Sequence, residues 1–318
     1  MTVDFATHRG RHRALTDFSL SVIAGETMAV VGESGSGKTV HALAVMGLLD
    51  CPPAEIVSGS VKYEGADLLQ LDAKQLRALR GNRIAMVFQD PMTSLNPVFT
   101  IGSQIEETLL THGKVKTKEQ ARARAVELLA DAGIDNPAER ASQYPHQFSG
   151  GMRQRAMIAC ALSCDPDIII ADEPTTALDV TIQAQILKLL ADLKAKYKTA
   201  VVLITHNLGI VAENSDRITV LYSGRVMERA KTADIFKNPR HPYTQGLLRA
   251  MPSVSGNPDR LDTIAGAPPA PYETISGCVF APRCPKAFAK CREIHPEETI
   301  FSDGSACACH LYGAEGKK

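Results

Sequence analysis

The sequence has no net charge and no long apolar run. Lys plus Arg and Asp plus Glu both number 35 in 318 residues, so the formal charge is zero. This balance argues against nucleic acid as the main partner, because phosphate binding normally requires a basic surface. No stretch approaches the roughly 20 apolar residues of a membrane span, and the N-terminus lacks the apolar core of a signal peptide. We therefore expect a soluble cytosolic protein whose membrane role, if any, comes through a partner.

The chain also lacks internal repeats and low-complexity tracts, and it is long enough for one large domain with an appendage or for two domains. Short apolar runs that are typical of buried parallel strands recur along it. They are Met28–Val31, Ile84–Phe88, Ile168–Ala171, Ala200–Ile204 and Ile218–Tyr222. Helical patterns separate most of them, which predicts an α/β fold with helices on both faces of a parallel sheet.

The interval between the second and third of these runs has no convincing strand. Its segment KEQARARAVELLADAGI places an apolar stripe along one face of a helix and charged residues opposite it. The stripe consists of Ala121, Ala125, Leu128, Leu129 and Ala132. We interpret residues 90–165 as a helical subdomain inserted into the sheet domain. Residues 251–270, rich in Pro, Gly and Ser, are typical of a linker, and residues 271–318 form a separate small cysteine-rich unit.

The segment GESGSGKT fits the phosphate-binding motif G-x-x-x-x-G-K-[ST] at every fixed position, between an apolar strand and an apolar-faced helix. Glycines let consecutive backbone N–H groups surround phosphate, and the helix N-terminus adds its dipole. Lys38 would reach the β- and γ-phosphates of ATP, and the Thr39 hydroxyl would ligate Mg²⁺. This context disfavours a glycine-rich turn that binds nothing. The expected cradle consists of Gly32, Glu33, Ser34, Gly35, Ser36, Gly37, Lys38, Thr39 and Val40.

The segment DIIIADEPTTALD supplies acidic residues for such a site. Three isoleucines predict a buried strand that delivers Asp172 and Glu173 at its carboxyl end, where ligands bind in open α/β sheets. Asp172 suits the Mg²⁺ shell, and Glu173 suits orienting or deprotonating the attacking water. Adjacent carboxylates at a strand end are more often solvated surface when seen alone, but the upstream P-loop favours the nucleotide interpretation.

A second glycine-rich turn, HQFSGGMRQR, opens a helix and is weak evidence by itself. Together with the P-loop, the acidic strand, TALD after it and ITH at the end of the next strand, it closely resembles the ATP-binding subunits of ABC transporters. The resemblance covers residues from about 5 to about 251. It implies an ATP-binding domain over residues 1–250, with a RecA-like P-loop NTPase sheet core, an N-terminal antiparallel β subdomain and an inserted α-helical subdomain.

The resemblance also implies roles for single residues. Gln89 is similar to the glutamine that senses Mg²⁺ and γ-phosphate beside the membrane subunit, His206 to the histidine that contacts the γ-phosphate, and Phe5 to the ring that stacks on adenine. The implied catalytic residues are Lys38, Gln89, Glu173 and His206, and the implied Mg²⁺ ligands are Thr39, Gln89 and Asp172. Two such subunits face each other head to tail. The residues that would act in the partner's site are Ser149, Gly150, Gly151 and Asp179.

Two further segments resemble one branch of the family. FQDPMTSLNPVFTIGSQIEETL and NPRHPYTQGLL are similar to importers of dipeptides and oligopeptides. The resemblance implies an ATPase that drives peptide import from the cytoplasmic face of the bacterial inner membrane, with nickel, glutathione or another small solute as alternative cargo. Implied partners are two membrane-spanning permease subunits, an extracytoplasmic substrate-binding protein and a second ATP-binding subunit, in a heterodimer or alternatively a homodimer. A soluble non-transport ABC ATPase and a redox-sensing ATPase are the alternatives from other classes.

Five of the eight cysteines lie in the last 41 residues. In the cytosol stable disulfides are rare, and the spacing lacks the C-x2–4-C pairs of structural zinc sites. Four thiolates at irregular spacing suit a [4Fe–4S] cluster at least as well. CVFAPRC also resembles the C-terminal region of dipeptide-type subunits, some of which carry such a cluster, and a cap without metal is the alternative. The implied ligands are Cys278, Cys284, Cys291 and Cys309, with Cys307 as an alternative fourth.

Overall fold

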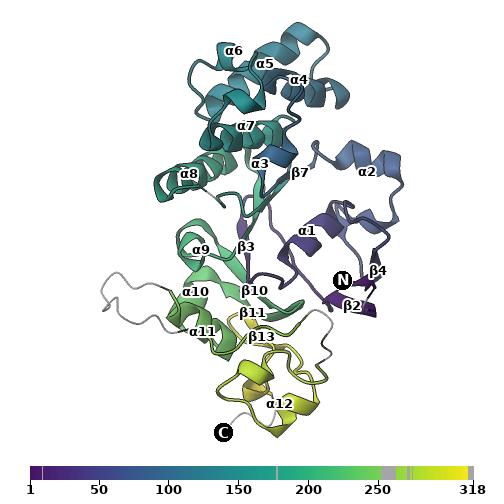
Figure 1. The fold of residues 1–318 in the computed structure, drawn as a ribbon, viewed down its shortest axis with the longest axis vertical. Helices are drawn as coiled ribbons and strands as arrows, with labels where there is room; N and C mark the ends of the chain where they lie inside the picture. The colour runs from purple at the N-terminus through teal and green to yellow at the C-terminus, as the bar shows by residue number, and fades with distance from the viewer. Residues whose placement is uncertain (9, 177, 252–262, 271–272, 274, 314–318) are drawn as a thin grey trace. The chain divides into compact units, whose positions relative to one another are not determined.

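The computed structural model describes the chain except residues 9, 177, 252–262, 271–272, 274 and 314–318 (Figure 1). The chain divides into two compact units, which are described separately below. Unit 1 comprises Met1–Ser21, Met28–Leu69 and Thr205–Lys318, and unit 2 comprises Val22–Thr27 and Gln70–Ile204. Most of the predicted linker, at 252–262, lies outside the described residues.

Unit 1 contains an antiparallel sheet in the order β2-β1-β4, a β5-β6 ribbon, and strands in the order β12-β13-β11-β10-β3. Its strands are β1 (Thr2–Thr7), β2 (Gly10–Leu15), β3 (Thr27–Val31), β4 (Ala54–Ser58), β5 (Lys62–Tyr63), β6 (Ala66–Asp67), β10 (Arg217–Tyr222), β11 (Arg225–Lys231), β12 (Thr299–Ile300) and β13 (Ala306–Cys307). Its α-helices are α1 (Lys38–Val45), α9 (Leu208–Asn214), α10 (Thr232–Lys237), α11 (Pro242–Arg249) and α12 (Ala289–Glu293). Its 3₁₀ turns are η1 (Leu68–Gln70), η3 (Ala281–Arg283) and η4 (His310–Tyr312).

The parallel pair β3–β10 forms the centre of unit 1. Every residue of β3 is buried, as its run of apolar residues predicts for a strand covered on both faces. Strand β10 turns back into β11 through Ser223 and Gly224, whose φ values of 45° and 75° are both positive. Two such residues are typical of a type I′ hairpin turn. The β1–β2–β4 sheet confirms the expected antiparallel β subdomain.

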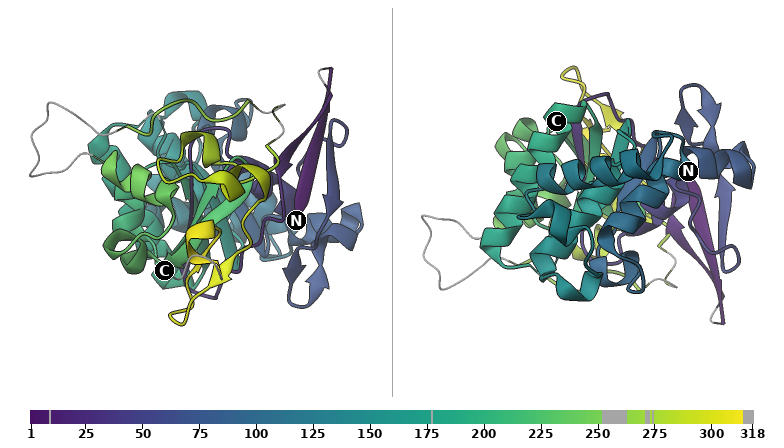
Figure 2. Two further views of the ribbon diagram at one scale, coloured as in Figure 1. Left: turned by 90° about the horizontal axis from the view of Figure 1, so that it is seen from below. Right: turned by 90° about the horizontal axis from the view of Figure 1, so that it is seen from above.

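The cysteine-rich region packs into the core of unit 1, whereas the sequence predicts a separate small unit. Strand β13 pairs with β11, with Ala306 opposite Arg229. The Phe280 side chain is 1% exposed and belongs to the same apolar cluster as Tyr222 and Tyr243. Figure 2 shows the yellow C-terminal segment beside the green β10–β11 hairpin. A short chain buries a small share of its own apolar surface, which explains why Phe280 packs in the core of the larger unit.

Unit 2 contains three parallel strands and the expected helices. The strands pair in the order β9-β8-β7, and their bounds are β7 (Ile84–Val87), β8 (Ile168–Asp172) and β9 (Ala200–Thr205). The helices are α2 (Ala73–Leu79), α3 (Pro91–Ser94), α4 (Ile101–Thr111), α5 (Lys118–Asp131), α6 (Pro137–Arg140), α7 (Gly150–Leu162) and α8 (Val180–Tyr197), with the 3₁₀ turn η2 (Pro145–Gln147).

The five predicted strands correspond to β3, β7, β8, β9 and β10, and their parallel pairing is confirmed. Residues 88–167, all of them described, contain helices and no strand. The predicted apolar stripe lies on α5 and its C-cap Ala132, and α5 packs against α4 and α7 (Figure 1). Its residues Ala121, Ala125, Leu128, Leu129 and Ala132 are all buried. A capping box formed by Thr117 and Gln120 begins this helix by satisfying its first free N–H groups.

Candidate nucleotide-binding and cysteine sites

The P-loop connects β3 to α1 within unit 1. Gly37 precedes α1 in a left-handed conformation with φ of 98°, which residues with a side chain rarely adopt. A Cβ at Gly37 would lie 2.8 Å from the Ala14 oxygen, and one at Gly32 would lie 2.1 Å from the Leu221 oxygen. These contacts explain why both positions require glycine. The loop is therefore pressed against neighbouring backbone, while Ser34, Gly35 and Thr39 remain exposed.

Lys38 is held beneath this loop. Its side chain is buried, and Nζ donates to the carbonyl oxygens of Gly32 at 2.8 Å and Glu33 at 3.0 Å. The buried Ser36 hydroxyl has no hydrogen-bond partner among the described residues. A preorganised ammonium, an orphan hydroxyl and an exposed Thr39 at a helix N-terminus form a donor set that fits the phosphates of ATP and a Mg²⁺ ion.

The acidic residues Asp172 and Glu173 lie at the carboxyl end of β8, beside β9, in unit 2. Asp172 is the last residue of β8, is 2% exposed and pairs with Ile204 of β9. The Glu173 N–H donates to the Ile204 oxygen at 2.9 Å. The Glu173 Oε2 atom accepts from the Thr176 hydroxyl at 2.9 Å and from Gln89 Nε2 at 3.3 Å. The structure thus brings the predicted water-orienting carboxylate and the predicted Mg²⁺-sensing glutamine into contact.

Glu173 also has an unusual backbone conformation. Its φ is 44°, in the left-handed region that costs a non-glycine residue on the order of 1–3 kcal/mol. The hydrogen bond to β9 and the two contacts to its carboxylate hold it there. Such strain clusters at active sites, and it supports a functional role for this residue.

Ser149 and Asp179 begin helices in unit 2. Ser149 is the N-cap of α7 and accepts from the Met152 N–H, and Asp179 is the N-cap of α8 and accepts from the Ile182 N–H at 2.9 Å. A Cβ at Gly151 would approach an Ile182 methyl group to 3.0 Å. The exposed N-terminus of α7, which includes Gly150, can receive an anion from outside the chain.

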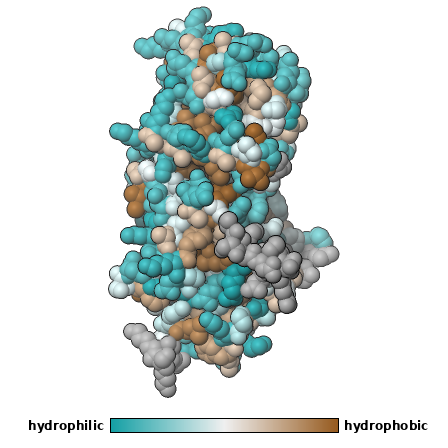
Figure 3. Space-filling view, turned by 90° about the vertical axis from the view of Figure 1, so that its left-hand side faces the viewer, coloured by the Kyte–Doolittle hydropathy of each residue, from teal (hydrophilic) through white to brown (hydrophobic). Residues whose placement is uncertain are grey.

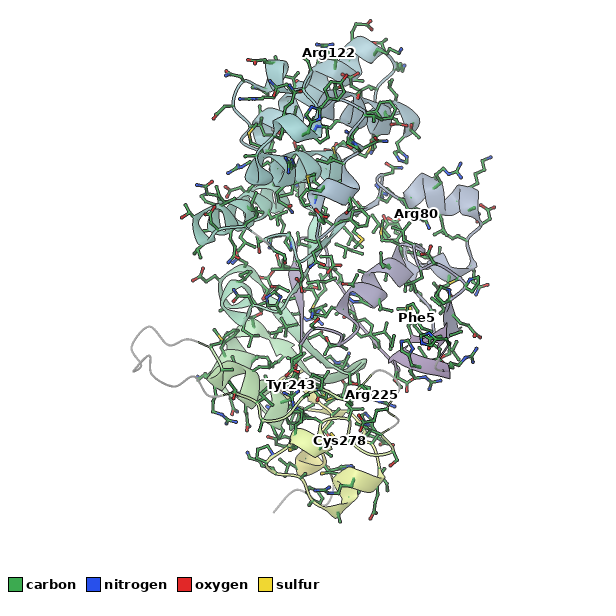
Figure 4. All side chains as sticks on the ribbon, viewed as in Figure 1. Phe5, Arg80, Arg122, Arg225, Tyr243 and Cys278 are labelled. Carbon is green, nitrogen blue, oxygen red and sulfur yellow. The ribbon has the colours of Figure 1, made fainter. Side chains whose placement is uncertain are left out.

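Phe5 and His206 both belong to unit 1. Phe5 lies on β1, and its half-buried ring stacks on His12 of β2 with centroids 5.6 Å apart. Figure 4 labels Phe5 in the antiparallel sheet, where β1 is the central strand between β2 and β4. His206 is exposed and directly follows β9. The predicted nucleotide residues are therefore distributed over both units.

Four of the five C-terminal cysteines line one pocket in unit 1. Its lining also includes His241, Lys286 and His310, and its cysteines are Cys278, Cys284, Cys291 and Cys309. Burial raises the pKa of the Cys278 and Cys309 thiols to about 11. Cys307 lies in β13, fully buried opposite Glu228. The pocket therefore groups the four cysteines that the family resemblance selects as ligands.

Neither a preformed single-ion site nor a membrane span is present in the described part of the chain. No three His, Cys, Asp or Glu side chains there are arranged to hold a metal ion, so the thiols as placed do not form a ready-made metal site. No described helix combines the length and apolarity needed to cross a bilayer. On the face in Figure 3, hydrophilic residues are mixed with smaller apolar areas.

Comparison with known proteins identifies the class. The family described as "ABC transporter" matches residues 15–176. The dimeric post-hydrolysis structure of the ATP-binding cassette MJ0796 bound to ADP and Pi is similar, with a TM-score of 0.65 and 31% identity over 73% of this chain and 96% of that chain. The cbiO1 protein from Clostridium perfringens, part of the cbiONQ transporter complex, has a TM-score of 0.62 and 25% identity over 74% and 88%.

A second family, "Oligopeptide/dipeptide transporter, C-terminal region", matches residues 227–291. The oligopeptide transport ATP-binding protein AppD of Bacillus subtilis is 51% identical over 94% of this chain and 90% of its own length. The dipeptide transport ATP-binding protein DppD of Escherichia coli is 47% identical over 98% and 94%. The chain belongs to the ATP-binding subunits of ABC transporters, in the oligopeptide/dipeptide group, and it is an ATPase.

Some contacts at these sites have no signal in the sequence. No sequence motif singles out Thr176, whose hydroxyl donates to Glu173, or His12, which stacks on Phe5. Tyr243 and Arg283 bond the P-loop residue Glu33 from far along the chain. Arg283 lies in the segment CVFAPRC, but only the folded structure shows that its side chain reaches Glu33 of the P-loop.

Proposed function

We propose that this chain is a motor subunit that couples ATP hydrolysis to the import of dipeptides or oligopeptides. The observation that carries the proposal is the match of residues 227–291 to the C-terminal region of oligopeptide/dipeptide transporters, next to an intact set of ATPase residues. Relatives that align over nearly their whole length are named for dipeptide or oligopeptide transport. In this role the chain acts at the cytoplasmic face of the bacterial inner membrane and does not contact the cargo.

In the proposed reaction, water attacks the γ-phosphorus of ATP and the bond to the β–γ bridging oxygen breaks, giving ADP and phosphate. Thr39, Asp172 and Gln89 are the residues that would hold Mg²⁺, which would supply positive charge to the β- and γ-phosphates. Lys38 binds the same phosphates, and Glu173 orients the water and accepts its proton. His206 contacts the γ-phosphate. The contacts of Glu173 to Thr176 and Gln89 support this assignment, because they hold the carboxylate in one orientation.

The proposed partners are two membrane-spanning permease subunits, an extracytoplasmic substrate-binding protein and a second ATP-binding subunit. Exposed apolar side chains follow Gln89 in the segment expected to meet the membrane subunits. They are Met92, Val98 and Phe99, which are 56%, 71% and 53% exposed. Val180, next to the proposed partner-site residue Asp179, is 81% exposed. Several exposed apolar side chains in one segment are typical of protein interfaces, which supports the contact of residues 92–99 with the membrane subunits.

The cargo is tested with the complete transporter reconstituted in proteoliposomes. We expect dipeptides or oligopeptides, added with the binding protein, to stimulate ATP turnover and to accumulate inside the vesicles. Nickel or glutathione, added in the same way, should have neither effect. Stimulation by nickel or glutathione but not by peptides would show that the cargo assignment is wrong while leaving the ATPase assignment intact.

We further propose that Cys278, Cys284, Cys291 and Cys309 hold a [4Fe–4S] cluster, with Cys307 outside it. The shared pocket supports this proposal, since four thiols are the usual ligand set of such a cluster. The raised pKa values of Cys278 and Cys309 mean that these thiols are protonated at neutral pH without a cation, so binding would release protons. A bound cluster would act as a structural or redox centre. Because the described side chains are not arranged to hold a metal ion, the four thiols must move into their coordination geometry when the cluster binds.

The cluster proposal is tested by replacing single cysteines. We expect anaerobically purified wild-type protein to contain iron and sulfide and to absorb visible light. Cys309→Ser should lose most of the iron, whereas Cys307→Ser, which removes a buried thiol outside the pocket, should retain it. Iron and acid-labile sulfide are measured per chain. Iron loss in Cys307→Ser alone would make Cys307 the fourth ligand, and iron-free wild-type protein would contradict the cluster.

A further inference from the structure

The P-loop residue Glu33 is bound by the C-terminal part of the chain, within unit 1. Arg283 Nη1 donates to Glu33 Oε2 at 2.8 Å, across 250 residues of sequence. The Glu33 backbone N–H donates to the Tyr243 hydroxyl at 3.1 Å, across 210 residues. Figure 4 shows Tyr243 near Cys278 in the same part of unit 1. Both the side chain and the backbone of Glu33 are therefore held from outside the loop.

Arg283 is itself rigidly held. Its side chain is 7% exposed. Nε donates to the Ala265 oxygen at 3.0 Å, Nη2 to the Ile264 oxygen at 3.2 Å, and Nη1 also to the Tyr222 hydroxyl at 3.2 Å. The guanidinium is planar and these three hydrogen bonds already fix its orientation. It therefore loses little conformational entropy when it also binds the Glu33 carboxylate. It acts as a fixed positive charge beside Glu33.

The segment that carries Arg283 also carries two of the pocket cysteines. Arg283 ends the η3 turn and directly precedes Cys284. The Ala281 N–H donates to the Cys278 oxygen at 2.9 Å, and the Cys278 N–H donates to the Cys291 oxygen at 2.8 Å. Phe280 packs with centroids 5.3 Å from Tyr222 and 5.2 Å from Tyr243. The cysteine pocket and the anchor of Glu33 therefore share one tightly packed segment.

A carboxylate in a phosphate-binding loop is electrostatically unfavourable for ATP, because it repels the triphosphate. At Glu33 the Arg283 guanidinium compensates this charge and keeps the carboxylate turned toward the C-terminal region. We propose that Arg283 is a positioning residue for the P-loop, through which the C-terminal region sets the affinity for ATP. This proposal needs only the ATPase activity and goes beyond the assignment of peptide cargo and of the cysteine ligands.

The proposal is tested on the full chain with a fluorescent ATP analogue. Arg283→Gln should weaken binding by about 3- to 10-fold, the size expected when one partner of a partly exposed charge pair is removed. In ATPase assays the variant should show a raised KM with little change in kcat, because Arg283 does not touch the reacting atoms. Arg283→Lys, which keeps the charge but loses the planar fork, should restore part of the affinity. Arg292→Gln, an exposed charge removal on α12 in the same region, is the matched control and should bind as wild type.

Two more variants, Glu33→Gln and the double replacement Glu33→Gln/Arg283→Gln, complete a double-mutant cycle with Arg283→Gln. If Arg283 acts by compensating Glu33, the double variant should regain most of the affinity that Arg283→Gln loses. Its failure to do so would mean that Arg283 acts through general folding or through the cysteine pocket, and the proposal would be wrong. Equal affinities of Arg283→Gln and Arg292→Gln would also overturn it. Thermal unfolding of each variant shows whether it is folded before binding is compared.

Discussion

Glu173→Gln is expected to lower ATP turnover by about 10²- to 10⁴-fold, the range that general base catalysis contributes, while ATP stays bound. Glutamine has the same shape and can still accept from Thr176 and Gln89, so the geometry around the site should persist. It cannot take a proton from water, however. The bound γ-phosphate would then remain and hold two nucleotide-bound subunits together. Phosphate release gives the rate, and size-exclusion chromatography with ATP detects the trapped dimer.

The matched control for this prediction is Glu127→Gln. Glu127 is exposed on α5, where it pairs with Arg124 three residues earlier, and such surface pairs contribute little to stability. The control should turn over ATP at the wild-type rate and should not form a stable dimer. Normal turnover by Glu173→Gln itself would show that another group activates the water.

Lys38→Met should abolish measurable ATP binding at ordinary concentrations, with a loss of affinity of at least about 30-fold. The buried Lys38 side chain donates to the Gly32 and Glu33 carbonyl oxygens. Methionine has a similar length but cannot donate these hydrogen bonds. The replacement also removes the positive charge that would face the phosphates, and loss of one partner of a buried charge pair costs about 2–5 kcal/mol. Equilibrium binding of the fluorescent analogue measures the effect directly.

Lys62→Met provides the comparison for Lys38→Met, because Lys62 lies in the same unit on an exposed part of β5. It should bind ATP as wild type does. Thermal unfolding without nucleotide is measured for both variants, since Lys38→Met leaves two carbonyl oxygens without this donor. A folded Lys38→Met protein that binds ATP normally would refute the role assigned to Lys38.

Much of the fold could be predicted because its signals are local. Three consecutive isoleucines before Asp172 indicate a buried strand, and the structure has β8 there. The stripe on α5 follows from helical periodicity, and the capping box at Thr117 begins the helix where the stripe starts. Gly37 occupies the left-handed position that a strand–loop–helix turn requires. Each of these features depends on residues close together in sequence.

The cysteine region was less predictable, because its structure depends on distant partners. Its composition and the preceding Pro- and Gly-rich stretch favour a separate unit. The pairing of β13 with β11 and the burial of Phe280 beside Tyr222 place it instead in the core of unit 1. Likewise, Cys307 and Cys309 are equivalent by spacing. They differ in space, because Cys307 lies in β13 opposite Glu228, whereas Cys309 follows that strand and alone of the two lines the pocket with the other three.

The strands, the helical insertion, the P-loop and the acidic strand end follow from the sequence, because periodicity and glycine-dependent turns act over a few residues. Contacts between groups that are far apart in the chain are visible only in the folded structure. Gln89 contacts Glu173 from 84 residues away, and Arg283 reaches Glu33 across 250. Such pairs form because packing of the whole core brings their elements together, and no local pattern encodes the identity of the partner.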